Sequence, residues 1–334
     1  MVGPVEEQVK DTKRLIIVPS GVLTSLPFHL LVTEKASKKA IANDIASYRK
    51  AAWLIKRQAV SIMPAVASLS ALRRGASRER AAKPLVGFGD PVFDPDRDIR
   101  DSKIAPENAR NLSRTAYTDF WQGAGIDRNR LSQNLARLPD TADELMAVAQ
   151  SVGAPTDDVH LGRDASETTV KRAPLADYRI VYFATHGLVA GDVKGLAEPS
   201  LVLSIPKQPT ELDDGLLTAS EVAQLKLNAD WVVLSACNTI AGDKPGAEAL
   251  SGLARAFFYA GARALLVSHW SVDSAAATRL TTSTFDVLKH DPKLGRAEAL
   301  RRAMLDYLND NASPINAYPA FWAPFALIGE GAAR

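Results

Sequence analysis

The chain contains a single cysteine, Cys237, which follows the strand-forming residues VVLS at 232–235. A second such run, IVYFAT at 180–185, leads directly into His186 and Gly187. A thiolate becomes a strong nucleophile when a neighbouring imidazole takes its proton or lowers its pKa. The two residues predict nucleophilic cysteine chemistry if the fold brings them together. Taken alone, Cys237 has a plainer alternative, because free cysteine often simply fills a core.

The elements that must position these residues are short apolar runs alternating with helical patterns. We expect strands at 14–19, 58–64, 84–90, 179–185, 200–204, 231–237, 264–270 and 325–329, and helices at 248–261, 273–290 and 295–309. Unalternating runs of this length suit parallel strands covered on both faces, so the pattern predicts an α/β sandwich with a mostly parallel sheet. Ligands gather at the carboxyl ends of such strands, where His186 and Cys237 lie 51 positions apart.

A length of 334 residues suggests roughly two domains. Residues 91–130 are rich in charge and poor in apolar periodicity, which predicts a long exposed connection. It would join residues 1–90 to residues 131–334.

Composition excludes several classes of partner. Lys plus Arg (40) nearly balances Asp plus Glu (38), and the net charge of +2 argues against nucleic acid or a membrane surface as partner. A single cysteine forms no internal disulfide, and no segment has the apolar length of a signal peptide or membrane span, so we expect a soluble, cytoplasmic protein. His29, His160 and His290 lack metal-ligand spacing, and GFGDP is not a full nucleotide-binding motif, so we expect no metal and no cofactor.

The segments THG (185–187) and LSACNT (234–239) resemble the CHAT family, bacterial caspase-like domains that are often fused to TPR repeats and related to separase. The likeness extends from about residue 14 to 330 and includes DGLLTASEVAQLKLNADWVVLSACNT and AFWAPFALIGE. It implies a caspase-like α/β/α sandwich, with an inactive caspase-like half at 1–90 and an active half at 131–334. It also implies a cysteine endopeptidase with a Cys-His dyad. The separation of about 50 residues between His and Cys in caspases agrees with this.

Carried over residue by residue, the resemblance makes Cys237 the nucleophile and His186 the general base and acid. Backbone N–H groups of Gly187 and Cys237 would form the oxyanion hole. Ser235, two positions before the nucleophile, would line the substrate pocket without demanding a charge. Asp273 lies near the place where separase has acidic residues that meet an arginine, which would favour a basic P1 residue, but it also stands where a helix N-cap belongs.

The function that follows is cleavage of a specific protein partner through an acyl-enzyme, in a bacterial signalling or defence pathway. We expect a TPR-type sensor or regulatory partner, in the same chain or in a separate one. Two alternatives stay open: a catalytically silent caspase-like scaffold, and a non-proteolytic cysteine hydrolase or acyltransferase.

Overall fold

The structure is a computed structural model of the 334-residue chain. It describes residues 6–35, 45–74, 79–94, 121–122, 125–126, 135–188, 198–235, 252–270 and 272–333. The predicted nucleophile, Cys237, lies outside the described residues, as does most of the predicted connection.

An eight-stranded sheet runs through the described part of the chain. Its strands, in spatial order, are β1 (Arg14–Ile17), β2 (Ala59–Ile62), β13 (Phe325–Gly329), β12 (Ala264–Ser268), β11 (Trp231–Leu234), β7 (Tyr178–Ala184), β3 (Lys83–Gly89) and β6 (Val159–Leu161). All neighbours are parallel except β12 and β13. The mostly parallel sheet predicted from the sequence is therefore confirmed.

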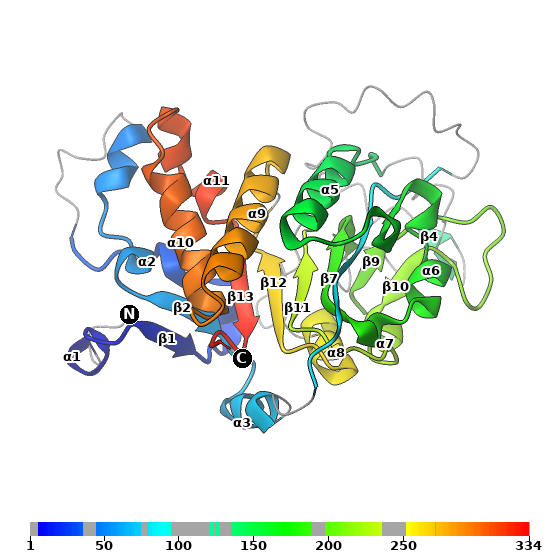
Figure 1. The fold of residues 1–334 in the computed structure, drawn as a ribbon, viewed down its shortest axis with the longest axis horizontal. Coiled ribbons are helices and arrows are strands. Elements are labelled where there is room, and N and C mark those ends of the chain that lie inside the picture. The colour runs from blue at the N-terminus through cyan, green and yellow to red at the C-terminus, as the bar shows by residue number, and fades with distance from the viewer. Residues whose placement is uncertain are drawn as a thin grey trace.

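Helices cover both faces of the sheet (Figure 1). The face that carries Tyr182 and Val233 packs against α5 (Asp140–Val152), α9 (Ser274–His290), α10 (Arg296–Asn309) and α11 (Pro319–Trp322). The face that carries Phe183 and Val232 packs against α6 (Glu167–Arg172), α7 (Ala219–Val222) and α8 (Gly252–Ala260). The remaining described helices are α1 (Glu6–Val9), α2 (Leu54–Arg57) and α3 (Val66–Arg74). Successive strand residues belong to opposite apolar layers, which explains why the sequence shows continuous apolar runs.

The predicted helices are found with small changes at their ends, and residues 248–251 of the helix expected at 248–261 lie outside the described residues. Asp273 caps α9, and α10 begins at Arg296. In α8 the helix ends before Gly261, whose φ of 117° is a conformation that favours glycine. None of the helices in the described part of the chain is long and apolar enough to cross a membrane.

The strands of residues 1–90 belong to the same sheet as those of residues 131–334. β1 and β2 extend the sheet beyond β13. β3, however, lies between β7 and β6, inside the part assigned to the catalytic half. The division into two caspase-like halves stays a prediction.

The expectation of a wholly exposed connection at 91–130 was wrong at its start. Residues 91–93 are buried. The Val92 N–H donates to the Ser204 hydroxyl oxygen, and the Val92 carbonyl oxygen accepts from the Ile205 N–H. Further along, β4 (Trp121–Gln122) and β5 (Gly125–Ile126) pair antiparallel. Two apolar residues, Val92 and Phe93, are enough to bury the start of the segment, because a second small sheet lies beside it. That sheet consists of β8 (His186–Leu188), β9 (Ser200–Val202) and β10 (Leu216–Thr218).

Candidate active site

His186 is held at the point where the chain leaves the large sheet for the small one. β7 ends at Ala184, and His186 opens β8, where it pairs with Val202. Thr185 between the two strands donates its hydroxyl hydrogen bond to the Val202 carbonyl oxygen. The junction is thus fixed by backbone pairing on both sides, and His186 is only 3% exposed.

One ring nitrogen of His186 bonds to a backbone carbonyl. Nε2 lies 2.8 Å from the carbonyl oxygen of Ala136. A carbonyl oxygen only accepts, so Nε2 carries the proton, and in the neutral ring the basic lone pair is on Nδ1. The ring also packs against Phe93, with ring centroids 5.2 Å apart. The ring of His186 is therefore held in a fixed orientation, with Nε2 as the protonated nitrogen of the neutral form.

The loop that supplies this carbonyl is anchored by an ion pair. Arg137 donates two hydrogen bonds to the Asp90 carboxylate, with Nε···Oδ1 at 2.7 Å and Nη2···Oδ2 at 2.6 Å. Burial raises the pKa of Asp90, and the bonds from Arg137 partly reverse this. The Asp90 N–H in turn donates to Thr141 in α5 at 2.8 Å. Asp90, with a φ of 47°, ties the end of β3 to the loop that orients His186.

β11 lies directly beside β7 and ends at the same edge. The strands pair in parallel, with Leu234 opposite Phe183, and the Ser235 N–H donates to the Phe183 carbonyl oxygen at 2.9 Å. Ser235 is buried and is the last described residue before Cys237. Parallel pairing thus brings the Ser235 end of β11 to the edge that carries His186, as the sequence predicted.

The other predicted site residues lie in different settings. Gly187 is half-buried in β8, opposite Leu201. Asp273 is exposed, and its Oδ1 accepts the N–H of Ala276 at 2.9 Å, which makes it the N-cap of α9. The N-cap role weighed for Asp273 is therefore confirmed, whereas its role toward substrate stays a prediction.

Sequence reasoning missed the residues that orient His186. Phe93, Asp90, Ala136 and Arg137 precede His186 by 49 to 96 positions. Asp90 and Phe93 lie in VGFGDPVF (86–93), a segment of the likeness to the CHAT family, but nothing in that segment points to His186. Asp90 stands in GFGDP. It is set apart by its positive φ at the end of a strand, which is uncommon for a non-glycine residue and is visible only in the structure.

Comparison with known proteins defines the class of the chain. The family model of the CHAT domain matches residues 1–330, and the chain belongs to this family. Tetratricopeptide repeat protein 28 is similar, at 35% identity over 219 residues for Homo sapiens and 27% over 226 residues for Mus musculus. Each match covers 58% of this chain but only 8% of the relative, so the chain corresponds to a small part of those proteins.

One solved structure shows the same fold, and a second aligns more weakly. The Arg specific cysteine proteinase gingipain R aligns with 99% of this chain and 66% of its own, with a TM-score of 0.50 and 11% identity. A Saccharomyces cerevisiae separase–securin complex aligns with 81% of this chain and 14% of its own, with a TM-score of 0.43 and 11% identity. The predicted caspase-like α/β fold is confirmed.

Proposed function

We propose that the chain is a cysteine endopeptidase in which Cys237 is the nucleophile and His186 the general base and acid. The observation that carries the proposal is the hydrogen bond from His186 Nε2 to the Ala136 carbonyl oxygen. It leaves Nδ1 as the basic atom of a ring held at the edge where β11 ends, two residues before Cys237. The caspase-like fold and membership of the CHAT family support the same assignment.

The reaction would be acyl transfer from a peptide to water. His186 Nδ1 takes the thiol proton, and the Cys237 sulfur attacks the peptide carbonyl carbon, whose π electron pair moves to oxygen. Collapse of the tetrahedral intermediate breaks the C–N bond as His186 protonates the leaving amine. Water, deprotonated by His186, then hydrolyses the thioester and restores the thiol.

The Ala136 carbonyl adds a specific contribution to this sequence. When His186 is protonated, both ring nitrogens donate, and the bond from Nε2 to the Ala136 oxygen gains strength because the donor is charged. The loop thus stabilises the imidazolium that forms after the thiol proton is transferred. A neutral carbonyl does this without adding a buried carboxylate next to the dyad.

Binding and specificity are assigned on the family pattern. Backbone N–H groups of Gly187 and Cys237 would hold the oxyanion, and removing such a donor costs about 10²–10³ in rate. Ser235 would line the P1 pocket. Asp273 would favour a basic P1 residue from its exposed position at the N-cap of α9. Comparing the P1 preference of wild type with that of Asp273→Asn tests this role. An unchanged preference removes Asp273 from the pocket.

Alkylation of the single cysteine tests the dyad without knowledge of the substrate. We expect iodoacetamide to label Cys237 at pH 7 faster than it labels glutathione, and His186→Gln to slow labelling by about tenfold or more. His290→Gln is the matched control, because His290 is exposed at the end of α9. Equal labelling rates in wild type and His186→Gln would contradict the proposal.

The partner is a protein substrate, and we infer that a TPR-type sensor regulates the domain, because the similar mammalian proteins are tetratricopeptide repeat proteins by name. A bacterial signalling or defence pathway is the setting we propose. N-terminal mapping of fragments from host lysate, treated with wild type or Cys237→Ala, identifies the substrate. A thiol that stays unlabelled favours the silent scaffold, and turnover of small esters without cleavage of any peptide favours a non-proteolytic hydrolase or acyltransferase.

A further inference from the structure

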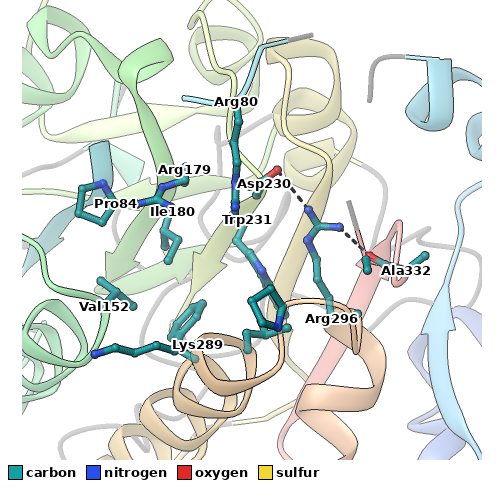
Figure 2. Close-up of a pocket in the computed structure, with 15 residues that line it drawn as sticks. Arg80, Pro84, Val152, Arg179, Ile180, Asp230, Trp231, Lys289, Arg296 and Ala332 are labelled. Atoms are coloured by element: carbon teal, nitrogen blue, oxygen red, sulfur yellow. Dashed lines mark hydrogen bonds and ion pairs between the residues drawn. The ribbon is translucent and has the colours of Figure 1, made fainter. Parts of the chain in front are cut away.

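A cavity of about 300 Å³ lies where the central strands β7 and β11 begin (Figure 2). His186 follows the other end of β7. Arg179 and Ile180, at the start of β7, and Asp230 and Trp231, at the start of β11, line it. The end of α9, the start of α10 and the residues after β13 close it. The two central strands therefore reach the candidate active site at one end and this cavity at the other.

The cavity lining carries an excess of positive charge. Arg80, Arg179, Lys289 and Arg296 contribute cations, and Asp230 contributes the carboxylate. Asp230 bonds to Arg80 Nε at 2.7 Å and to Arg296 Nη2 at 3.2 Å, which engages two of the four cations. Arg263, behind the wall, also lies 3.8 Å from Asp230.

The other two cations have only backbone carbonyl partners in the described structure. Arg179 Nε donates to the Lys83 carbonyl oxygen at 3.4 Å, and Lys289 Nζ to that of Ser151 at 3.1 Å. Burial lowers the pKa of Arg179, the nearby charge of Arg80 lowers it further, and the carboxylate of Asp230 partly reverses this. The lining keeps a net positive charge all the same, because Asp230 is the only carboxylate among its described residues and faces four cations.

Arg296 adds a buried donor that lacks an acceptor. The residue is only 5% exposed, and its Nη1 donates to the carbonyl oxygens of Glu330 and Ala332. Its Nε–H has no hydrogen-bond partner within the ranges that the structure describes. Buried donors are normally paired, so an acceptor is missing at this point of the wall. Burial also lowers the pKa of Arg296, to about 10.

The rest of the wall is apolar. Val152, Leu288 and Pro292 line it together with the rings of Trp231 and Phe285, which pack edge-to-face at 5.7 Å between centroids. Small-molecule sites typically combine an apolar wall with a few convergent polar groups in about 300–1,000 Å³. This cavity has both features, at the lower end of that size range.

We propose that the cavity binds a small organic anion, with its carboxylate or phosphate held by Arg179, Lys289 and Arg80 and its apolar body against Val152 and Leu288. Arginine and lysine together suit a phosphate or carboxylate, and the guanidinium groups bind it in two-pronged geometry. The site is separate from the proposed dyad, so binding does not depend on peptidase activity.

Calorimetric titration of the full chain with 1-naphthyl phosphate tests the proposal. The same titration of the Cys237→Ala variant, which lacks the proposed nucleophile, measures binding independently of any peptidase activity. We expect saturable 1:1 binding in the micromolar range, at least tenfold tighter than binding of uncharged 1-naphthol or of inorganic phosphate. Arg179→Gln and Lys289→Gln should each weaken binding by about fivefold or more, because each removes a charge-assisted contact. Arg302→Gln, on the exposed side of α10, should leave it unchanged.

Thermal unfolding of each variant shows whether the fold is intact, and wild type should unfold at a higher temperature with the ligand present. Two results overturn the proposal. One is the absence of saturable binding of both 1-naphthyl phosphate and 1-naphthoate up to about 1 mM, roughly the weakest affinity of a specific small-molecule site. The other is equal affinity in wild type and a folded Arg179→Gln/Lys289→Gln double variant.

Discussion

Two buried histidines should make the protein unstable in mild acid. His29 and His269 are 4% and 7% exposed, and their ring centroids lie 5.9 Å apart. His29 Nε2 bonds to the Ala323 carbonyl oxygen at 2.9 Å, whereas neither ring nitrogen of His269 has a partner within the described residues. Burial lowers the pKa of His29 from 6.5 to about 4, and burial together with His29 lowers the pKa of His269 to about 3.

The sign of the effect follows from proton binding. In the unfolded chain both histidines take up protons as the pH falls through 6.5, while in the folded protein they stay neutral until about pH 4 and 3. The unfolded state therefore binds more protons below pH 6.5, and folding stability, fully present above that pH, decreases as the pH falls. At pH 5 the gap from 6.5 corresponds to about 2 kcal/mol for each histidine, or about 4 kcal/mol for both.

Urea unfolding of wild type and of the double variant His29→Gln/His269→Leu, at pH 8, 7, 6 and 5, measures this term. The amide introduced by His29→Gln would still donate to the Ala323 carbonyl oxygen, and the apolar side chain introduced by His269→Leu would suit its apolar surroundings. Both substitutions therefore remove titration with little loss of packing. Between pH 8 and 5, wild type should lose about 4 kcal/mol more than the double variant. The comparison is needed because burial raises the pKa of Glu167 to about 7, which stabilises the folded state in acid and partly hides the histidine effect.

His290→Gln serves as the control, because His290 is exposed. This substitution should leave the wild-type stability profile unchanged. Parallel pH profiles for wild type and the double variant would refute the reasoning, since they would mean that both histidines protonate in the folded protein as easily as in the unfolded one.

Substitutions at four positions test the described packing. Arg137→Leu leaves a largely buried carboxylate without its partner and should cost about 2–4 kcal/mol in urea unfolding, and it should slow alkylation of the cysteine because the loop that orients the histidine loosens. Gly261→Ala would place a Cβ against the Leu227 carbonyl oxygen and should cost at least about 3 kcal/mol in thermal unfolding, whereas Gly153→Ala meets no atom and should cost about 1 kcal/mol. Asp273→Ala removes the cap of α9 and should cost about 1 kcal/mol, and Asp273→Asn should cost little, as calorimetry can show.

The large parallel strands could be predicted from the sequence because they are buried on both faces. Runs such as IVYFAT and WVVL alternate between two apolar layers, so hydrophobicity alone marks them. β6, β8 and β10 have three residues each, too few for any periodicity to be visible. The position of His186 at a strand end could be predicted because the apolar run IVYFAT stops directly before it.

The surroundings of His186 depend on contacts far apart in sequence. Ala136 contributes only a backbone carbonyl, which any residue type supplies, so its position cannot be marked by side-chain chemistry. Arg137 and Asp90 are common surface residue types, and only the folded chain shows that they pair with each other. The same holds for the cavity, whose cations come from segments between residues 80 and 296.

The two ends of the central strands differ in net charge. Beside His186, the charges of Asp90 and Arg137 offset each other, whereas the cavity at the other end holds four cations and one carboxylate. The seven residues of β7 span about 20 Å, and a unit charge at that distance contributes at most about 0.8 kcal/mol at an effective dielectric constant of about 20. Salt reduces this further, since the distance exceeds the Debye length of about 8 Å. An anion in the cavity would therefore shift the titration of the proposed dyad by about half a pKa unit at most. Any larger effect on Cys237 would have to pass through the packing of β7 and β11 rather than through the electric field.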